Sequence, residues 1–178
     1  GYVYGVPWGD AGLHTNRATR PSGVYGMVKR ACEEALLLQA RRGLRMQILR
    51  LFNVYGPGQE KAVTYKSTLF LDKLRQLSDA RQGEVIPVAS PEWVTRDFIY
   101  ISDVAAAFIG VMETRQLRKA YPAIINVGMG VPITVGAALA QLAEAAGRAD
   151  VSFSYAKEAF PWDVGRNRQA PYYAGGQV

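Results

Sequence analysis

Tyr25 and Lys29 are the residues of this sequence whose types and spacing most directly suggest chemistry. A period of apolar residues predicts a helix over residues 24–41, and two residues four positions apart on a helix share one face. A phenol is a poor base at neutral pH, but a neighbouring ammonium stabilises the phenolate. The pair therefore predicts an acid/base group that exchanges a proton with a hydroxyl or a ketone. The alternative is a surface pair that shares a helix face by chance.

Helices and strands alternate along the rest of the chain. Strands are predicted at 46–51, 85–88, 98–101, 123–127 and 151–155, with a strand end at 2–4, and further helices at 67–77, 103–114 and 135–146. Pro87 favours an edge position, and Thr134 is a candidate N-cap. Such alternation favours an α/β domain with a largely parallel sheet.

Composition excludes several classes of protein. With 178 residues and 49% hydrophobic residues, the chain can bury a sizeable core. No apolar run reaches the length of a membrane-spanning helix, so no membrane association is expected. The single cysteine, Cys32, is expected to be a core residue and is compatible with a cytoplasmic setting, and the lone His14 argues against a metal site. The net charge of +6 suits an anionic ligand, but the basic residues are scattered rather than forming the stripe of a nucleic-acid-binding surface.

Four further segments stand in an order typical of one protein family. YVYG begins at Tyr2, RLFNVYGPG at Arg50, RDFIYISDV at Arg96 and INVG at Ile125. Together with Tyr25-Gly26-Met27-Val28-Lys29, they make the sequence resemble the extended short-chain dehydrogenase/reductases of the NAD-dependent sugar epimerase/dehydratase family. The resemblance implies a partial Rossmann-like fold, doubly wound and mostly parallel, with a smaller substrate-binding α/β lobe. Residues 1–58 would belong to the dinucleotide-binding domain, and 59–178 mainly to the nucleotide-sugar-binding lobe, with some segments returning to the Rossmann sheet.

The resemblance also implies roles for particular residues. Tyr25 and Lys29 would be catalytic and would contact the cofactor, Lys29 through the nicotinamide ribose. Leu51 and Phe52 would lie near the nicotinamide, mainly through backbone atoms. The residues implied to bind the nucleotide sugar are Asn53 and Arg96 at its phosphates, Val88 near its base and Asp163 at a ribose hydroxyl. The resemblance further implies a homodimer through the helix at 24–41.

Simpler structural interpretations stay open for some of these residues. Asn53 is alternatively a turn residue after a strand, and Arg96 a member of a surface salt bridge. Phe52, Phe98 and Ile101 are expected in the core rather than in contact with a ligand.

The sequence departs from the family pattern at its start. It contains no glycine-rich dinucleotide fingerprint, because Gly128-Met129-Gly130 lacks the third glycine. The family's catalytic Ser or Thr would fall immediately before Gly1. We therefore interpret the chain as the C-terminal part of a longer enzyme, expected to bind NAD weakly and to be inactive alone. NADP stays open as the cofactor, since the residue that selects between the two would lie upstream.

One missing group favours a particular reaction. Dehydratases and decarboxylases of the family carry an acid just before VYG, where this sequence has Tyr2 preceded by Gly1. We therefore expect epimerisation, in which hydride leaves C4 of the sugar and returns to the other face while Tyr25 takes and returns the hydroxyl proton. The alternatives are a dehydratase or reductase of the same family and, in another class, a non-catalytic member that binds RNA.

Overall fold

The computed structural model describes residues 2–4, 19–21, 23–43, 46–58, 69–113 and 123–158. Its helices are η1 (Tyr2–Tyr4), α1 (Val24–Ala40), α2 (Leu69–Asp79), α3 (Ile101–Glu113) and α4 (Val135–Ala145). Its strands are β1 (Gln47–Leu51), β2 (Asn53–Tyr55), β3 (Val85–Val88), β4 (Thr95–Tyr100), β5 (Ala123–Val127), β6 (Pro132–Thr134) and β7 (Ser152–Tyr155). Among these strands three pairs are parallel and one is antiparallel, which confirms the predicted α/β class.

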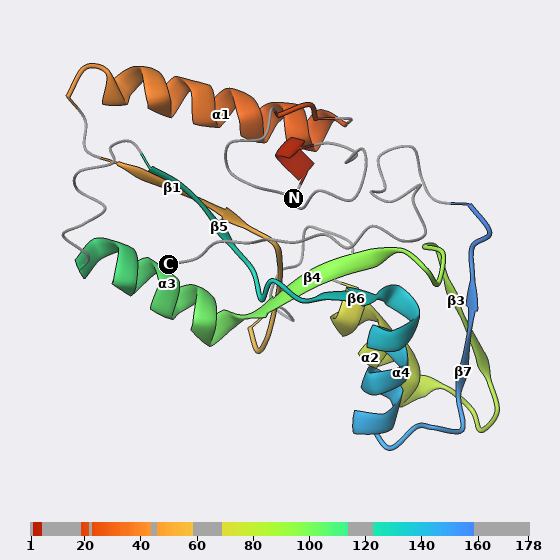
Figure 1. The fold of residues 1–178 in the computed structure, drawn as a ribbon. Coiled ribbons are helices and arrows are strands. Elements are labelled where there is room, and N and C mark those ends of the chain that lie inside the picture. The colour runs from red at the N-terminus through yellow and green to blue at the C-terminus, as the bar shows by residue number, and fades with distance from the viewer. Residues whose placement is uncertain are drawn as a thin grey trace.

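Strands β1 and β5 pair in parallel, with α1 on one face and α3 on the other (Figure 1). Side chains alternate along a strand, so each strand presents a different set to each helix. The apolar set facing α3 consists of Leu49, Leu51, Ile125 and Val127, which pack with Val104. The opposite face carries Arg50 and Asn126 beside Ile48 and Ile124, and Arg50 contacts Glu33 of α1.

A second sheet is built around β4, with β2 parallel to it on one side and β6 antiparallel on the other. Asn53 is the register partner of Phe98, and Tyr55 that of Tyr100. Phe52 joins β1 to β2, and its amide donates a 3.0 Å hydrogen bond to the carbonyl of Val127. The second sheet therefore continues directly from the strand that ends the first.

The remaining elements form a lobe in which α2 and α4 lie side by side next to the parallel β3–β7 pair (Figure 1). Its core contains Leu77, Ile86, Val88, Val94, Val135, Leu139, Ala143 and Val151. Leu77 and Leu139 are completely buried, and each contributes roughly 1.5–3 kcal/mol through the area it removes from water. The ammonium of Lys73 on α2 donates a 2.6 Å hydrogen bond to the carbonyl of Pro87, which ties α2 to β3.

Three expectations about individual residues are wrong. Residues 2–4 form a short 3-10 helix rather than a strand end, and Tyr4 within it is only 2% exposed. Cys32 is exposed rather than in the core, and Ile101 begins α3 with 40% of its surface exposed. The more buried stripe of α1 is Gly26, Arg30, Glu33, Leu37 and Ala40. Cys32 lies beside this stripe and not within it.

Other differences concern element boundaries. Strands β2 and β6 were not expected, since three residues are too few to show an alternating pattern. Asn53 consequently lies in a strand and not in a turn. The Thr134 cap is confirmed, because its hydroxyl accepts a 3.1 Å hydrogen bond from the amide of Ala137. Helix α2 ends two residues later than predicted, at Asp79.

Candidate active site

Tyr25 and Lys29 lie together on one flank of α1. The ammonium nitrogen of Lys29 is 5.5 Å from the centroid of the Tyr25 ring. Tyr25 is 56% exposed, and Lys29 is exposed as well. The helix starts directly after Gly23, whose extended backbone lets the chain enter the first turn just before Tyr25. The phenol and the ammonium thus lie on the same exposed flank of the helix.

The flank that carries this pair is one of three faces of α1. At about 100° per residue, Tyr25 and Lys29 point roughly a quarter turn away from the sheet-facing stripe. The face directly opposite the sheet is apolar and exposed, and it carries Val24, Val28, Ala31, Ala35 and Leu38. The helix therefore presents a polar pair on its side and an apolar strip on its outside.

The register of the second sheet brings Asn53 and Arg96 to one face. Asn53 is paired with Phe98, and Arg96 lies two residues before Phe98 on β4, so all three side chains emerge on the same side. Two residues span about 6–7 Å along a strand, which keeps Arg96 close to Asn53. The Asn53 amide donates a 2.9 Å hydrogen bond to the carbonyl of Asp97, and Arg96 donates one of 3.0 Å to the carbonyl of Thr95.

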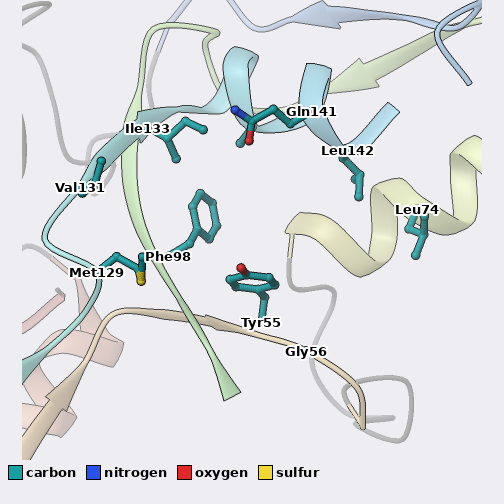
Figure 2. Close-up of a pocket in the computed structure, with 10 residues that line it drawn as sticks. Tyr55, Gly56, Leu74, Phe98, Met129, Val131, Ile133, Gln141 and Leu142 are labelled. Atoms are coloured by element: carbon teal, nitrogen blue, oxygen red, sulfur yellow. The ribbon is translucent and has the colours of Figure 1, made fainter. Parts of the chain in front are cut away.

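A cavity of about 490 Å³ adjoins this face, between the second sheet and helices α2 and α4 (Figure 2). Its lining includes Tyr55, Phe98, Met129, Val131, Ile133 and Leu142, with the amide of Gln141 at one side. Figure 2 shows the rings of Tyr55 and Phe98 rising from β2 and β4 toward α4. None of the described lining residues is charged. The volume and the apolar lining with a few polar groups are those of a small-molecule pocket.

The cavity and the Asn53–Arg96 face share residues. Ile133 of the cavity is the register partner of Arg96, and Phe98 is both a cavity residue and the partner of Asn53. Phe98, expected in the core, therefore lines a pocket. A ligand with an anionic end at Arg96 can place a neighbouring apolar or aromatic part in this cavity.

The other predicted contact residues occupy core positions. The Leu51 side chain packs toward α3, and Phe52 packs against the buried pair Val3 and Tyr4, as expected for a core residue. Val88 is 4% exposed within the lobe core. Asp163 lies outside the described residues.

Sequence reasoning missed Asp97. Its carboxylate accepts hydrogen bonds from the amides of Met129 (2.8 Å) and Gly130 (3.0 Å) and is 1% exposed. Burial raises the pKa of Asp97, although these two amide hydrogen bonds act to lower it. The Gly128-Met129-Gly130 segment thus wraps an internal carboxylate and carries Met129 to the cavity wall. The signal in the sequence was the strand alternation that turns Asp97 away from Arg96 and Phe98.

Comparison with known proteins identifies the family. Residues 2–128 match the NAD dependent epimerase/dehydratase family, over a range that includes Tyr25, Lys29, Asn53 and Arg96. The chain belongs to the NAD dependent epimerase/dehydratase family. This membership confirms the resemblance found in the sequence motifs.

Relatives within the epimerase/dehydratase family carry out more than one reaction. The dTDP-L-rhamnose 4-epimerase of Burkholderia thailandensis is 40% identical over 94 residues, which are 52% of this chain and 25% of that enzyme. The UDP-N-acetyl-alpha-D-glucosaminuronate decarboxylase of Bacillus cytotoxicus is 34% identical over 104 residues, 58% of this chain and 30% of that enzyme. Both relatives act on nucleotide sugars, as their names state.

The fold of this family member is shared with solved epimerases. The crystal structure of the Thermus thermophilus UDP-glucose 4-epimerase in complex with NAD superposes with a TM-score of 0.73 at 25% identity, covering 98% of this chain and 53% of that one. The chain thus spans about half the length of this structure. In the part of this chain that the structure describes, no helix has the length and apolar character to cross a membrane, and no three acidic, His or Cys side chains gather as metal ligands.

Proposed function

We propose that this chain carries the catalytic pair and the nucleotide-sugar-binding face of an NAD-dependent nucleotide-sugar 4-epimerase. The observation that carries the proposal is the position of Tyr25 and Lys29, side by side and exposed on one flank of α1. A phenol and an ammonium so placed fit a cofactor ribose and a sugar hydroxyl at the same time. The epimerases among the relatives support the same reaction.

In this proposal Tyr25 holds the proton that the sugar loses and regains. Its phenolate oxygen accepts the proton of the C4 hydroxyl and later returns it to the C4 oxygen. Bound NAD would supply the acceptor for the C4 hydride and its return to the opposite face of the sugar. Lys29 stabilises the phenolate and donates to the cofactor ribose, while Leu51 and Phe52 approach the nicotinamide through their backbone.

The nucleotide diphosphate is assigned to the face that Asn53 and Arg96 share. The Arg96 guanidinium suits phosphate oxygens, and a second amide hydrogen of Asn53 is left after its bond to the Asp97 carbonyl. The aromatic and apolar cavity next to this face then receives the nucleoside. Val88, through its backbone, and Asp163 complete the proposed contacts to base and ribose.

The outer face of α1 is proposed as the surface of a homodimer. The described residues of this chain leave much of its apolar surface uncovered, since Val24 is 77% exposed, Val28 55% and Leu38 50%. Their spacing of three and four forms a continuous strip with small Ala31 and Ala35 at its centre. Two such strips can pack closely because small residues let helices approach.

The decarboxylase relative supports a second candidate reaction, the loss of CO₂ from a sugar acid after the same oxidation at C4. The two reactions are separated by their products. An epimerase returns a nucleotide sugar of unchanged mass, whereas a decarboxylase lowers the mass by one CO₂. A dehydratase would lower it by one water, and a reductase would consume NAD(P)H.

The experiment incubates UDP- and dTDP-sugars with NAD and either this chain or any longer natural protein that contains it, and analyses products by chromatography and mass spectrometry. We expect a longer protein to interconvert C4 epimers, and this chain alone to bind NAD weakly and show no turnover, because its sequence lacks the glycine-rich fingerprint. Tyr25→Phe should lower kcat about 10²–10⁴-fold, the range typical of losing a general acid/base. Full turnover by Tyr25→Phe, or RNA binding that nucleotide sugars leave unchanged, would contradict the proposal.

A further inference from the structure

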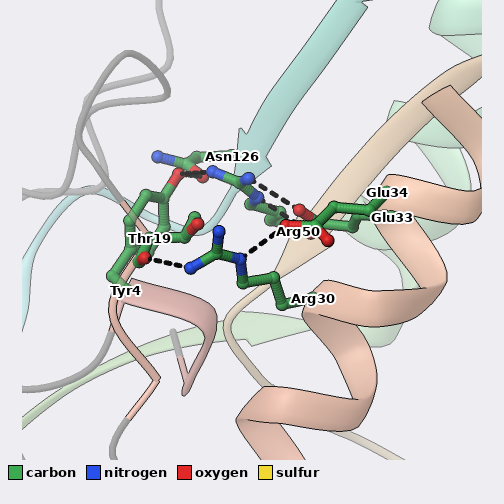
Figure 3. A network of polar contacts seen from close by, with 7 residues as sticks. All are labelled: Tyr4, Thr19, Arg30, Glu33, Glu34, Arg50 and Asn126. Carbon is green, nitrogen blue, oxygen red and sulfur yellow. Dashed lines mark hydrogen bonds and ion pairs between the residues drawn. The ribbon is translucent and has the colours of Figure 1, made fainter. Parts of the chain in front are cut away.

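A buried polar network joins four separate segments of the chain (Figure 3). The Nε and Nη2 atoms of Arg50 donate to the two carboxylate oxygens of Glu33 at 2.9 and 2.7 Å. Its Nη1 donates to the Tyr4 hydroxyl at 2.6 Å, and that hydroxyl donates to Oδ1 of Asn126 at 2.6 Å. The side chains of Arg50 and Glu33 are only 6% and 13% exposed. The network is therefore shielded from water.

Each member comes from a segment that bears on the candidate site, although none has a role in the proposed chemistry. Glu33 lies on α1, one turn beyond Lys29, and Arg50 lies on β1 just before Leu51, Phe52 and Asn53. Tyr4 belongs to η1, and Asn126 to the neighbouring strand β5. The network thus links the helix of the acid/base pair to the strand that leads into the substrate face.

Stability alone does not account for a charged pair at this place. Removing two charges from water is costly, and an apolar pair of similar volume often gives equal or greater stability. A bidentate guanidinium–carboxylate contact fixes the relative orientation of the two side chains, because both carboxylate oxygens must accept hydrogen bonds at the same time. Burial acts to lower the pKa of Arg50, but its bonds to Glu33 and Tyr4 raise it overall, so the guanidinium keeps its charge.

Because Glu33 and the Tyr25–Lys29 pair lie on one helix, a contact that fixes Glu33 also fixes the position of the pair. Glu33 follows Tyr25 by eight residues, which corresponds to about 12 Å along the axis and slightly more than two turns. With both carboxylate oxygens held by Arg50, α1 can neither rotate nor slide on β1 without breaking the contact. We propose that Arg50 and Glu33 are positioning residues that fix the Tyr25–Lys29 pair relative to the end of β1. This inference rests on the proposed function of that pair.

Three variants test the inference. Glu33→Gln removes the negative charge of the buried pair and leaves Arg50 charged. Glu34→Gln is its matched control, since Glu34 is the next residue on α1 and its pair with Arg30 is exposed. The double variant Glu33→Leu with Arg50→Met replaces the buried pair by apolar side chains and is expected to keep the unfolding midpoint of the wild type. Comparison of these proteins separates folding from positioning.

The orientation of α1 can be measured in this chain without turnover. Cys32 is the single cysteine of the sequence and is exposed on α1, so a nitroxide attached there reports on nearby backbone amides. We expect the paramagnetic relaxation of residues 47–53 to change in Glu33→Gln and in the double variant but not in Glu34→Gln. In a protein that turns over nucleotide sugar, kcat should fall about 10–100-fold in the double variant, because small misplacements of catalytic groups have such effects, while KM stays within about threefold.

Two results would overturn the inference. One is a double variant with wild-type relaxation at residues 47–53, which would show that the network does not orient α1. The other is a displaced helix with undiminished kcat, which would show that orientation has no bearing on the reaction. If the wild type turns over no nucleotide sugar, the proposed function fails, whereas the relaxation data still decide whether the network orients the helix.

Discussion

Gly128 lies so close to Asp97 that a Cβ atom built on it would stand 2.7 Å from the carboxylate oxygen Oδ2. The contact joins the end of β5 to the middle of β4. Since Asp97 is buried and already holds two backbone amides, its carboxylate has no room to retreat. Glycine is thus required here by space and not by an unusual backbone angle.

Replacing Gly128 by alanine should therefore lower the free energy of unfolding by about 1–3 kcal/mol, the usual cost of overpacking. Gly110→Ala is the matched control. Gly110 lies in α3 with nothing within 4 Å of an added Cβ, so this change should be neutral or stabilising by about 0.5–1 kcal/mol. Urea denaturation of both variants checks the contrast, and equal stabilities would contradict the close contact.

The stability contributed by Asp97 should depend on pH in a definite direction. Burial raises the pKa of Asp97 above the usual 3.8, so the folded protein holds this proton more tightly than the unfolded chain. Its contribution is then complete below about pH 3.8 and declines as pH rises through the raised pKa. The unfolding free energy of the wild type should therefore fall relative to that of Asp97→Asn as pH is raised from acid to neutral. A wild-type advantage that grows with pH would show the opposite shift.

Arg96 should be the main charged contact of the nucleotide diphosphate. Arg96→Met should weaken the binding of UDP or dTDP about 10–100-fold, since hydrogen bonds to charged groups contribute about 1.5–3 kcal/mol. Arg75→Met removes an equal charge from an exposed position on α2 and should leave affinity unchanged. Isothermal titration calorimetry on this chain provides the comparison. Equal losses in both variants would indicate a general charge effect rather than a site.

Association through α1 predicts that a charge on its outer face separates the subunits. Ala35→Asp should convert a dimer to a monomer in light scattering after size-exclusion chromatography, because it buries an unpaired carboxylate in the interface. Ala140→Asp places the same side chain on an exposed position of α4 and should leave the mass unchanged. A wild type that is monomeric at all concentrations would refute the proposed surface.

The parts of the site that depend on local spacing could be predicted from the sequence. Tyr25 and Lys29 share a flank because the helical period places them there, and that period is visible in the chain. The meeting of Asn53 with Arg96 depends on the register between β2 and β4, which no local pattern determines. The role of Asp97 could not be predicted for the same reason, since its partners Met129 and Gly130 are distant in sequence.

The orientation of α1 is the clearest case where the pattern misleads. Its apolar residues suggest a face that packs on the sheet, yet Val28 and Leu38 are about half exposed. The sheet side instead carries Glu33, whose buried ion pair with Arg50 of β1 takes the place of apolar packing. The hydrophobic period of the sequence predicts the helix. It predicts which face of the helix is buried only when the surface that this face packs against is apolar.

The return of β5 to β1 has a consequence for cutting the chain. The predicted division at residue 58 has some later segments returning to the Rossmann sheet, and Ala123–Val127 pairs with Gln47–Leu51 in one continuous ladder. A single protease cut between β2 and β4 would leave both pieces held together by that ladder and by the packing of α3 beneath it. The nicked halves should co-elute as one species until denaturant separates them. Halves that are expressed separately, the first without Gln47–Leu51 and the second without Ala123–Val127, should not associate to restore function.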